Sequence, residues 1–126
     1  MDIHELLAIA ASKVNERELS RLASAGTVAA AILTDQGNVY TGVNIDVPAG
    51  MGFCAEHSAI AAMVAAGESR MVKLAATGVD DHGRACAPCG RCGEFINCID
   101  DENYKCEVIL EDGSITTIGE LLPYRL

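Results

Sequence analysis

Basic residues are scarce in this chain of 126 residues. Nine Lys and Arg stand against 18 Asp and Glu, which gives a net charge of −9 at pH 7. Proteins that bind nucleic acids usually gather Lys and Arg into a stripe that displaces counterions from the phosphates. The nine cations here are scattered, so the composition argues against a nucleic acid polymer as a partner.

Long apolar runs and targeting signals are also missing. Half of the residues are hydrophobic, yet every apolar run stops well short of the roughly 18 residues that a membrane span requires. The start, Met1 to Glu5, is neither a charged n-region nor followed by a secretory cleavage pattern. We therefore expect a cytoplasmic protein with no membrane partner, whose six cysteines stay reduced.

No linker, repeat or low-complexity tract divides the sequence, so residues 1–126 are expected to form a single domain. Hydrophobic periodicity predicts a helix over residues 2–19, capped by Asp2, a second helix after Cys54, and a third from Pro88 through Ile96. The expected strands are 27–34, 39–43, 71–79, 106–110 and 115–118. A hairpin followed by alternating helices and strands predicts an α/β fold, a three-layer α/β/α sandwich with a mixed five-stranded sheet.

Two short segments, 54–56 and 88–92, bring cysteines to helix starts. Cys54 follows a Gly-rich turn and opens an Ala-rich run, so it should lie at a helix N-terminus, where free amides and the helix dipole favour a thiolate. Pro88 likewise suits a helix start, which places Cys89 and Cys92 one turn apart on the same face. Two helix starts would then converge on one metal ion.

A catalytic zinc needs three protein ligands and an open position for water. Cys54, Cys89 and Cys92 supply three thiolates, and Glu56 lies two residues from the first of them. We therefore expect one zinc ion per chain, with Glu56 as the proton carrier. Taken alone, the spacing of Cys89 and Cys92 also fits a redox pair or a structural zinc knot. Cys86, three residues before Cys89, is the alternative ligand.

The two segments resemble the signature of the zinc-dependent cytidine deaminase superfamily, in which H-x-E, or C-x-E, precedes P-C-x-x-C. Further similar stretches, Thr41–Asn44 and Glu120–Pro123, extend the resemblance over most of the chain and favour the small free-nucleoside branch. The resemblance implies a cytidine deaminase-like fold and a zinc-dependent hydrolase of pyrimidine salvage that deaminates free cytidine or deoxycytidine. A blasticidin-S or modified-nucleoside deaminase is the alternative within the family.

The resemblance also implies which residues bind substrate. The family's pair for the ribose hydroxyls maps onto Asn44 and Asp46, although Asn and Asp also commonly cap turns. Ala55 belongs to the same expected pocket. Arg91 and His57 are expected to donate to the zinc-bound sulfurs and so tune them, while an exposed, solvated Arg91 is the alternative.

The family's aromatic residues beside the pyrimidine map approximately onto Gly26 and Leu126, so the usual aromatic clamp is absent. We expect Tyr124 to replace it. Related enzymes of this size are usually homotetramers, and the Ala-rich helix over residues 59–66 offers an interface through which Leu126 and Tyr124 would reach a neighbouring subunit. A non-catalytic zinc or thiol protein is the alternative from another functional class, but it gives Glu56 no role.

Overall fold

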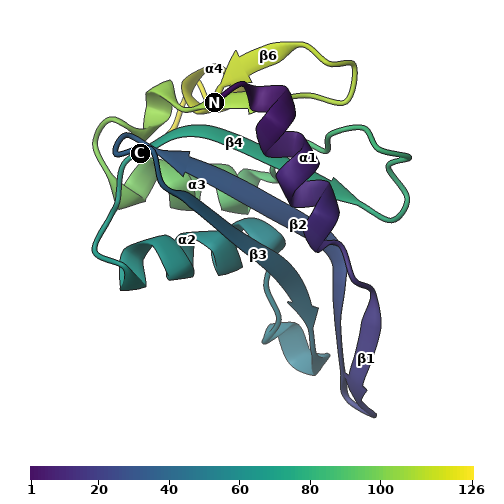
Figure 1. The fold of residues 1–126 in the computed structure, drawn as a ribbon. Coiled ribbons are helices and arrows are strands. Elements are labelled where there is room, and N and C mark those ends of the chain that lie inside the picture. The colour runs from purple at the N-terminus through teal and green to yellow at the C-terminus, as the bar shows by residue number, and fades with distance from the viewer.

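The computed structural model describes residues 1–126 as one six-stranded sheet with helices on both faces (Figure 1). The helical segments are α1 (Ile3–Lys13), the 3-10 turn η1 (Pro48–Gly50), α2 (Ala55–Ala65), α3 (Gly90–Ile99), the 3-10 turn η2 (Asn103–Lys105) and α4 (Ile118–Leu121). The strands are β1 (Arg17–Ser20), β2 (Ala23–Thr34), β3 (Val39–Asp46), β4 (Met71–Gly78), β5 (Glu107–Ile109) and β6 (Ile115–Thr117). None of the helices combines the length and the apolar character that crossing a membrane requires.

The longest strand, β2, pairs with three others. β1, β3 and β4 all run antiparallel to it, while β5 runs parallel to β4 and antiparallel to β6. The sheet is therefore mixed, as the sequence predicts. It has six strands where five were expected, because β1 adds to one edge of β2.

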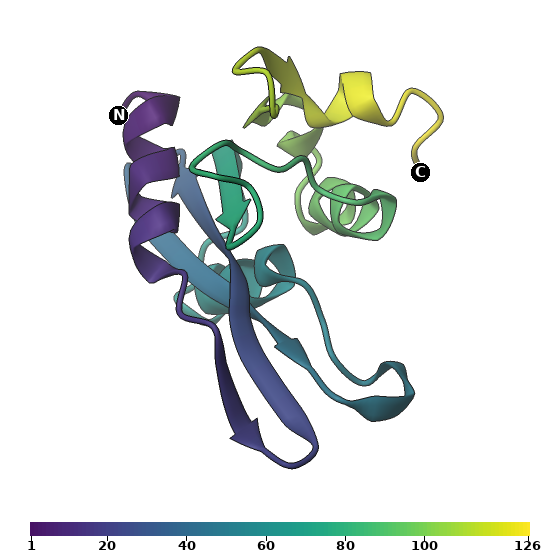
Figure 2. The ribbon, with the colours of Figure 1, turned by 90° about the vertical axis from the view of Figure 1, so that its right-hand side faces the viewer.

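The additional strand, β1, starts inside residues 2–19 and ends at Ser20, so the prediction of one continuous helix over residues 2–19 was wrong. α1 starts as expected, with Asp2 and Glu5 forming a reciprocal capping box, but it ends at Lys13. The next residue, Val14, has extended backbone, and the Asn15 amide then donates to the carbonyl of Gly26 at 3.0 Å. Pairing with β2 thus replaces the last helical turns, and Figure 2 shows the resulting β1–β2 hairpin extending past the rest of the sheet.

Two separate groups of buried residues cover the two faces of the sheet. On one face, Leu6 and Ala10 of α1 pack with sheet residues such as Leu33. On the other, Ile60 of α2 and Ile96 of α3 pack with sheet residues that include Ile32, Leu74 and Val108. The prediction of a three-layer α/β/α arrangement is confirmed, and it places α2 and α3 together on the same face (Figure 1).

Candidate metal centre and catalytic cavity

The first half of the candidate metal centre is the segment between the end of β3 and the start of α2. Phe53 and Ile45 exchange backbone hydrogen bonds at 3.0 and 3.1 Å, which fixes the residue directly before Cys54. Gly52 permits this close approach, since a Cβ there would lie 2.3 Å from the carbonyl oxygen of Ile45. Cys54 is therefore held in extended backbone as the N-cap of α2.

The second half of the centre is the start of α3. Cys89 is the N-cap of this helix, and its sulfur accepts a 3.4 Å hydrogen bond from the amide of Cys92. Capping residues adopt extended backbone while the following residues are helical, so the two cysteine side chains turn to the same side. Their sulfurs lie 3.4 Å apart.

The structure brings the three predicted ligands together: the sulfurs of Cys54, Cys89 and Cys92 all lie within 4.8 Å of one another. Burial raises the pKa of the Cys92 thiol, so the ionised cluster needs a cation beside it. Three thiolates are a donor set that Zn²⁺ prefers. Cys86 stands outside this cluster, and burial raises the pKa of its thiol to about 12.

A cavity of about 420 Å³ opens beside the sulfurs. It is lined by Val28, Asn44, Asp46, Gly52, Phe53, Cys54, Ala55, Glu56, Cys86, Ala87, Cys89 and Arg91. Glu56 is only 5% exposed, and burial raises the pKa of its carboxyl. A carboxyl with a raised pKa, in one cavity with two of the predicted metal ligands and free of hydrogen bonds to other side chains, is suited to accept and release protons.

The two residues expected to bind sugar hydroxyls lie at the end of β3, which runs three residues further than the sequence predicts. Asn44 is engaged within the protein: its Oδ1 accepts from the Val28 amide at 2.9 Å, and its Nδ2 donates to Thr27 at 2.7 Å and to Asp46 at 3.1 Å. Both amide donors are therefore used. Asp46 lines the cavity and keeps acceptor capacity for a ligand.

The two expected partners of the sulfurs differ in their placement. His57 stacks on Phe95 with ring centroids 4.4 Å apart, and its Nδ1 lies 3.4 Å from the sulfur of Cys92. Arg91 lines the cavity, but its side chain makes no hydrogen bond or ion pair in the structure. The structure thus brings the side chain of His57, and not that of Arg91, within hydrogen-bond distance of a predicted ligand.

The aromatic residue of the cavity is one that the sequence reasoning missed. Tyr124, the expected replacement for the aromatic clamp, is 99% exposed and lines no cavity of this chain. Phe53 lines the cavity instead, and its position directly before Cys54 was the available signal. Gly26 has a φ of 84°, and a Cβ there would lie 2.0 Å from the backbone oxygen of Asn15, so no aromatic side chain fits at that position.

Known proteins with similar sequences and structures agree with this geometry. Cytidine deaminase from Mycobacterium tuberculosis (strain ATCC 25618 / H37Rv) is 41% identical over 70 residues, which are 55% of this chain and 51% of that protein. By this measure the chain spans about half the length of the curated relatives it matches. The crystal structure of cytidine deaminase from Mycobacterium tuberculosis is 29% identical, with a TM-score of 0.81, over 100% of this chain and 98% of that chain.

The crystal structure of cytidine deaminase from Mycobacterium leprae is 27% identical, with a TM-score of 0.79, and the match covers 98% of each chain. The sequence model of the family "Cytidine and deoxycytidylate deaminase zinc-binding region" matches residues 1–107. This matched range contains both cysteine segments and every residue that lines the cavity. The chain therefore belongs to the cytidine and deoxycytidylate deaminase family that this zinc-binding region defines.

Proposed function

We propose that this protein is a zinc-dependent hydrolase that deaminates free cytidine or deoxycytidine to the uridine form, with release of ammonia. One observation carries the proposal: the buried carboxyl of Glu56 shares a cavity with Cys54 and Cys89, two of the three cysteines that would hold one zinc ion per chain. The cytidine deaminases among its relatives support the same reaction. A non-catalytic zinc or thiol protein would have no need for this carboxyl.

Zinc held by the three sulfurs would supply a Lewis acid that activates water at the cavity. The carboxylate of Glu56 takes a proton from the attacking water as its oxygen adds to C4 of the pyrimidine. Glu56 then passes a proton to the ring nitrogen and assists departure of the amino group as ammonia. Each transfer needs the carboxyl within hydrogen-bond reach of the proton that moves, which its place beside the sulfurs supports.

The cavity suits a free nucleoside. Its volume of about 420 Å³ lies within the range of small-molecule sites, and the net charge of −9 disfavours a polyphosphate chain. We infer that Asp46 accepts from a sugar hydroxyl while Asn44 holds it in place through the 3.1 Å bond. Because Gly26 excludes the usual aromatic side chain, blasticidin S and modified nucleosides are the alternative substrates.

One assay tests the proposal and its alternatives together. Ammonia release is measured on cytidine, deoxycytidine, blasticidin S and free cytosine, with bound zinc quantified in the same preparation. We expect turnover of cytidine or deoxycytidine with about one zinc per chain. Turnover of blasticidin S alone would identify the protein as the blasticidin-S deaminase alternative, and zinc without turnover of any of these compounds would favour the non-catalytic alternative.

We also propose that the chains assemble as a homotetramer, in a cytoplasmic enzyme of pyrimidine salvage. In the single chain only one face of α2 is packed, and its opposite face, Ala61, Ala62, Val64 and Ala65, is exposed. Leu126, at the chain end, is 92% exposed. A partner subunit would cover such apolar surface. Light scattering at micromolar concentration should give a mass near four chains, and an active monomer would contradict this assembly.

A further inference from the structure

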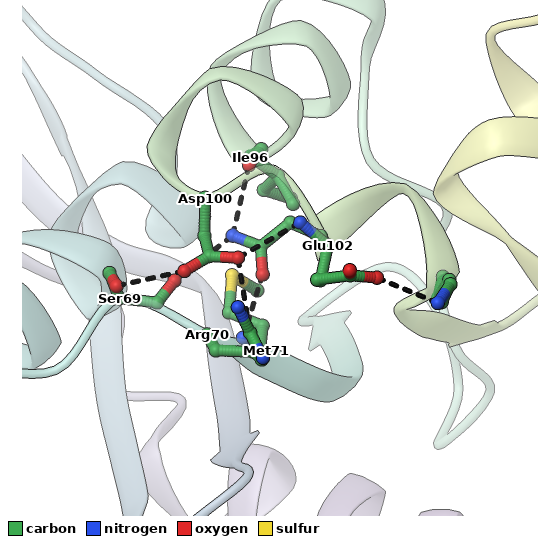
Figure 3. Close-up of polar contacts among 8 residues, drawn as sticks. Ser69, Arg70, Met71, Ile96, Asp100 and Glu102 are labelled. Carbon is green, nitrogen blue, oxygen red and sulfur yellow. Dashed lines mark hydrogen bonds and ion pairs between the residues drawn. The ribbon is translucent and has the colours of Figure 1, made fainter.

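A polar cluster joins the far ends of α2 and α3, the two helices whose first residues carry the cysteines. Ser69 and Arg70, which follow α2, bond Asp100, which follows α3 (Figure 3). The fourth member, Asn103, also follows α3 and bonds Ser69. None of these residues lines the cavity. The proposed chemistry therefore leaves this cluster without an assigned role.

Asn103 is the buried centre of the cluster and is 0% exposed. Its Nδ2 donates to the carbonyl of Ile96 at 3.1 Å and to that of Ser69 at 3.0 Å, and its Oδ1 accepts from the Met71 amide at 2.8 Å. Ile96 lies four residues, or about one helical turn, after Cys92. One side chain thus bonds both the turn of α3 next to a metal ligand and the segment that leads out of α2.

Asp100 is the C-cap of α3 and reinforces the same connection. Its carboxylate accepts from Ser69 Oγ and Arg70 Nε, each at 3.1 Å, and from the Glu102 amide at 2.9 Å (Figure 3). The side chain is only 16% exposed, and these donors, the Glu102 amide first, lower the pKa of the carboxyl. Charge-assisted bonds of this kind are stronger than neutral ones, so the end of α3 is firmly held.

Ser69 and Arg70 are in turn fixed to α2. The amide of Gly67 donates to Val64 at 3.0 Å, and the amide of Glu68 donates to Met63 at 3.1 Å. These bonds close the last turn of α2 and leave Ser69 and Arg70 at a fixed position beyond it. A movement of α3 relative to α2 would therefore have to break the contacts of Asp100 and Asn103.

At the other end, the same two helices meet through the three sulfurs and the stack of His57 on Phe95. α3 has ten residues and is about 15 Å long, so a tilt at its far end shifts the sulfurs of Cys89 and Cys92. We propose that the cluster of Ser69, Arg70, Asp100 and Asn103 is a positioning device, which keeps α3 at the angle where its two sulfurs meet Cys54 and Glu56. This inference rests on the zinc site of the proposed function.

Zinc release tests the inference without any substrate. The rate at which zinc passes to a chromogenic chelator is measured for the parent chain, for Asp100→Ala, and for Asn103→Ala if that variant folds. Changing partners beyond the metal ligands typically costs about 10- to 100-fold in metal affinity, and because Asp100 acts through the helix we expect release about tenfold faster, at the low end. Asp100→Asn keeps an acceptor oxygen and should restore most of the slow release.

Glu68→Gln is the matched control. Glu68 lies in the same segment after α2, but its carboxylate accepts hydrogen bonds from Asn38 and Tyr40 and none from α3. This variant should lower the thermal midpoint and leave zinc release unchanged. The rate of zinc release is measured for each variant at the same number of degrees below its thermal midpoint. A general loss of stability then does not by itself change the compared rates.

The kinetic constants give a second measurement, and they would not change in this way if the cluster only stabilised the fold. Asp100→Ala should lower kcat severalfold with little change in KM, because the sulfurs and Glu56 are misaligned while the cavity walls remain. Equal zinc release in Asp100→Ala and Glu68→Gln, or parental release in Asp100→Ala, would overturn the positioning role. A parent chain that releases no ammonia from any nucleoside would refute the proposed function, yet the zinc measurements would still decide the role of the cluster.

Discussion

Replacing Glu56 by Gln separates the chemistry in the cavity from the fold around it. Gln has nearly the same shape, and the Glu56 side chain has no hydrogen-bond partner on another residue. The substitution therefore breaks no hydrogen bond to another residue, and it removes a carboxyl whose ionised form is disfavoured by burial at 5% exposure. We expect the variant to keep its zinc and to show a thermal midpoint at or slightly above that of the parent.

The expected loss lies in kcat. A general acid-base group typically contributes ~10²- to 10⁴-fold to the rate, and Glu56 is assigned several successive proton transfers, so we expect a loss of about 10⁴-fold. That corresponds to about 5 kcal/mol in activation free energy, since each tenfold change is about 1.4 kcal/mol. The assay is ammonia release from cytidine, with zinc content and thermal midpoint measured on the same sample. A fully zinc-loaded variant that keeps kcat within tenfold of the parent would falsify the assignment of Glu56.

Three further substitutions test the ligands, the sugar contact and the fold. Cys89→Ser should lose most bound zinc by metal analysis whereas Cys86→Ser keeps it, and full zinc in the first variant would contradict the ligand set. Asp46→Ala should lower kcat/KM for cytidine. The loss should correspond to about 1–3 kcal/mol of transition-state binding free energy, the cost of leaving a buried hydrogen-bonding group without its partner. Equal losses on cytidine and cytosine would instead show that Asp46 supports the fold. Gly26→Ala should cost more than the 1–2 kcal/mol typical of a left-handed residue, because its Cβ also meets backbone. Gly37→Ala, with φ 81° and open space around it, is the control, and similar unfolding free energies for the two variants would refute the steric argument.

The cysteine segments were predictable because the rules behind them are local. A Gly-rich turn before Cys54 and a Pro before Cys89 both signal a helix start, and the structure has each cysteine as an N-cap. The strands and the two-sided covering of the sheet also followed from periodicity. The prediction of a helix over residues 2–19 was wrong because Arg17–Ser20 pair with β2. This pairing joins separate segments of the chain, so the hydrophobic periodicity of residues 2–19 could not indicate it.

The residues that we expect to bind substrate were also predictable only in part. Asn44 and Asp46 were placed near the cavity by their position in the sequence, but only the structure shows that both amide donors of Asn44 are engaged within the protein. Phe53 enters the cavity because its backbone pairs with Ile45. Tyr124 is 99% exposed, while the backbone of Leu126 is bonded to Asn97 and Glu94 of α3. Side-chain direction at such positions depends on long-range contacts.

By itself, the sequence determined which residues can carry the chemistry: three thiols and a carboxyl at two helix starts, at spacings that local backbone geometry turns into converging side chains. Only the tertiary structure decided how those two helix starts are held together. The bonds of Asp100 and Asn103 to the segment after α2 cross about 30 residues of sequence, and the burial that raises the pKa of Glu56 comes from packing around it. Both depend on segments that meet only when the sheet has formed, because hydrogen-bond partners and burial are properties of the folded chain.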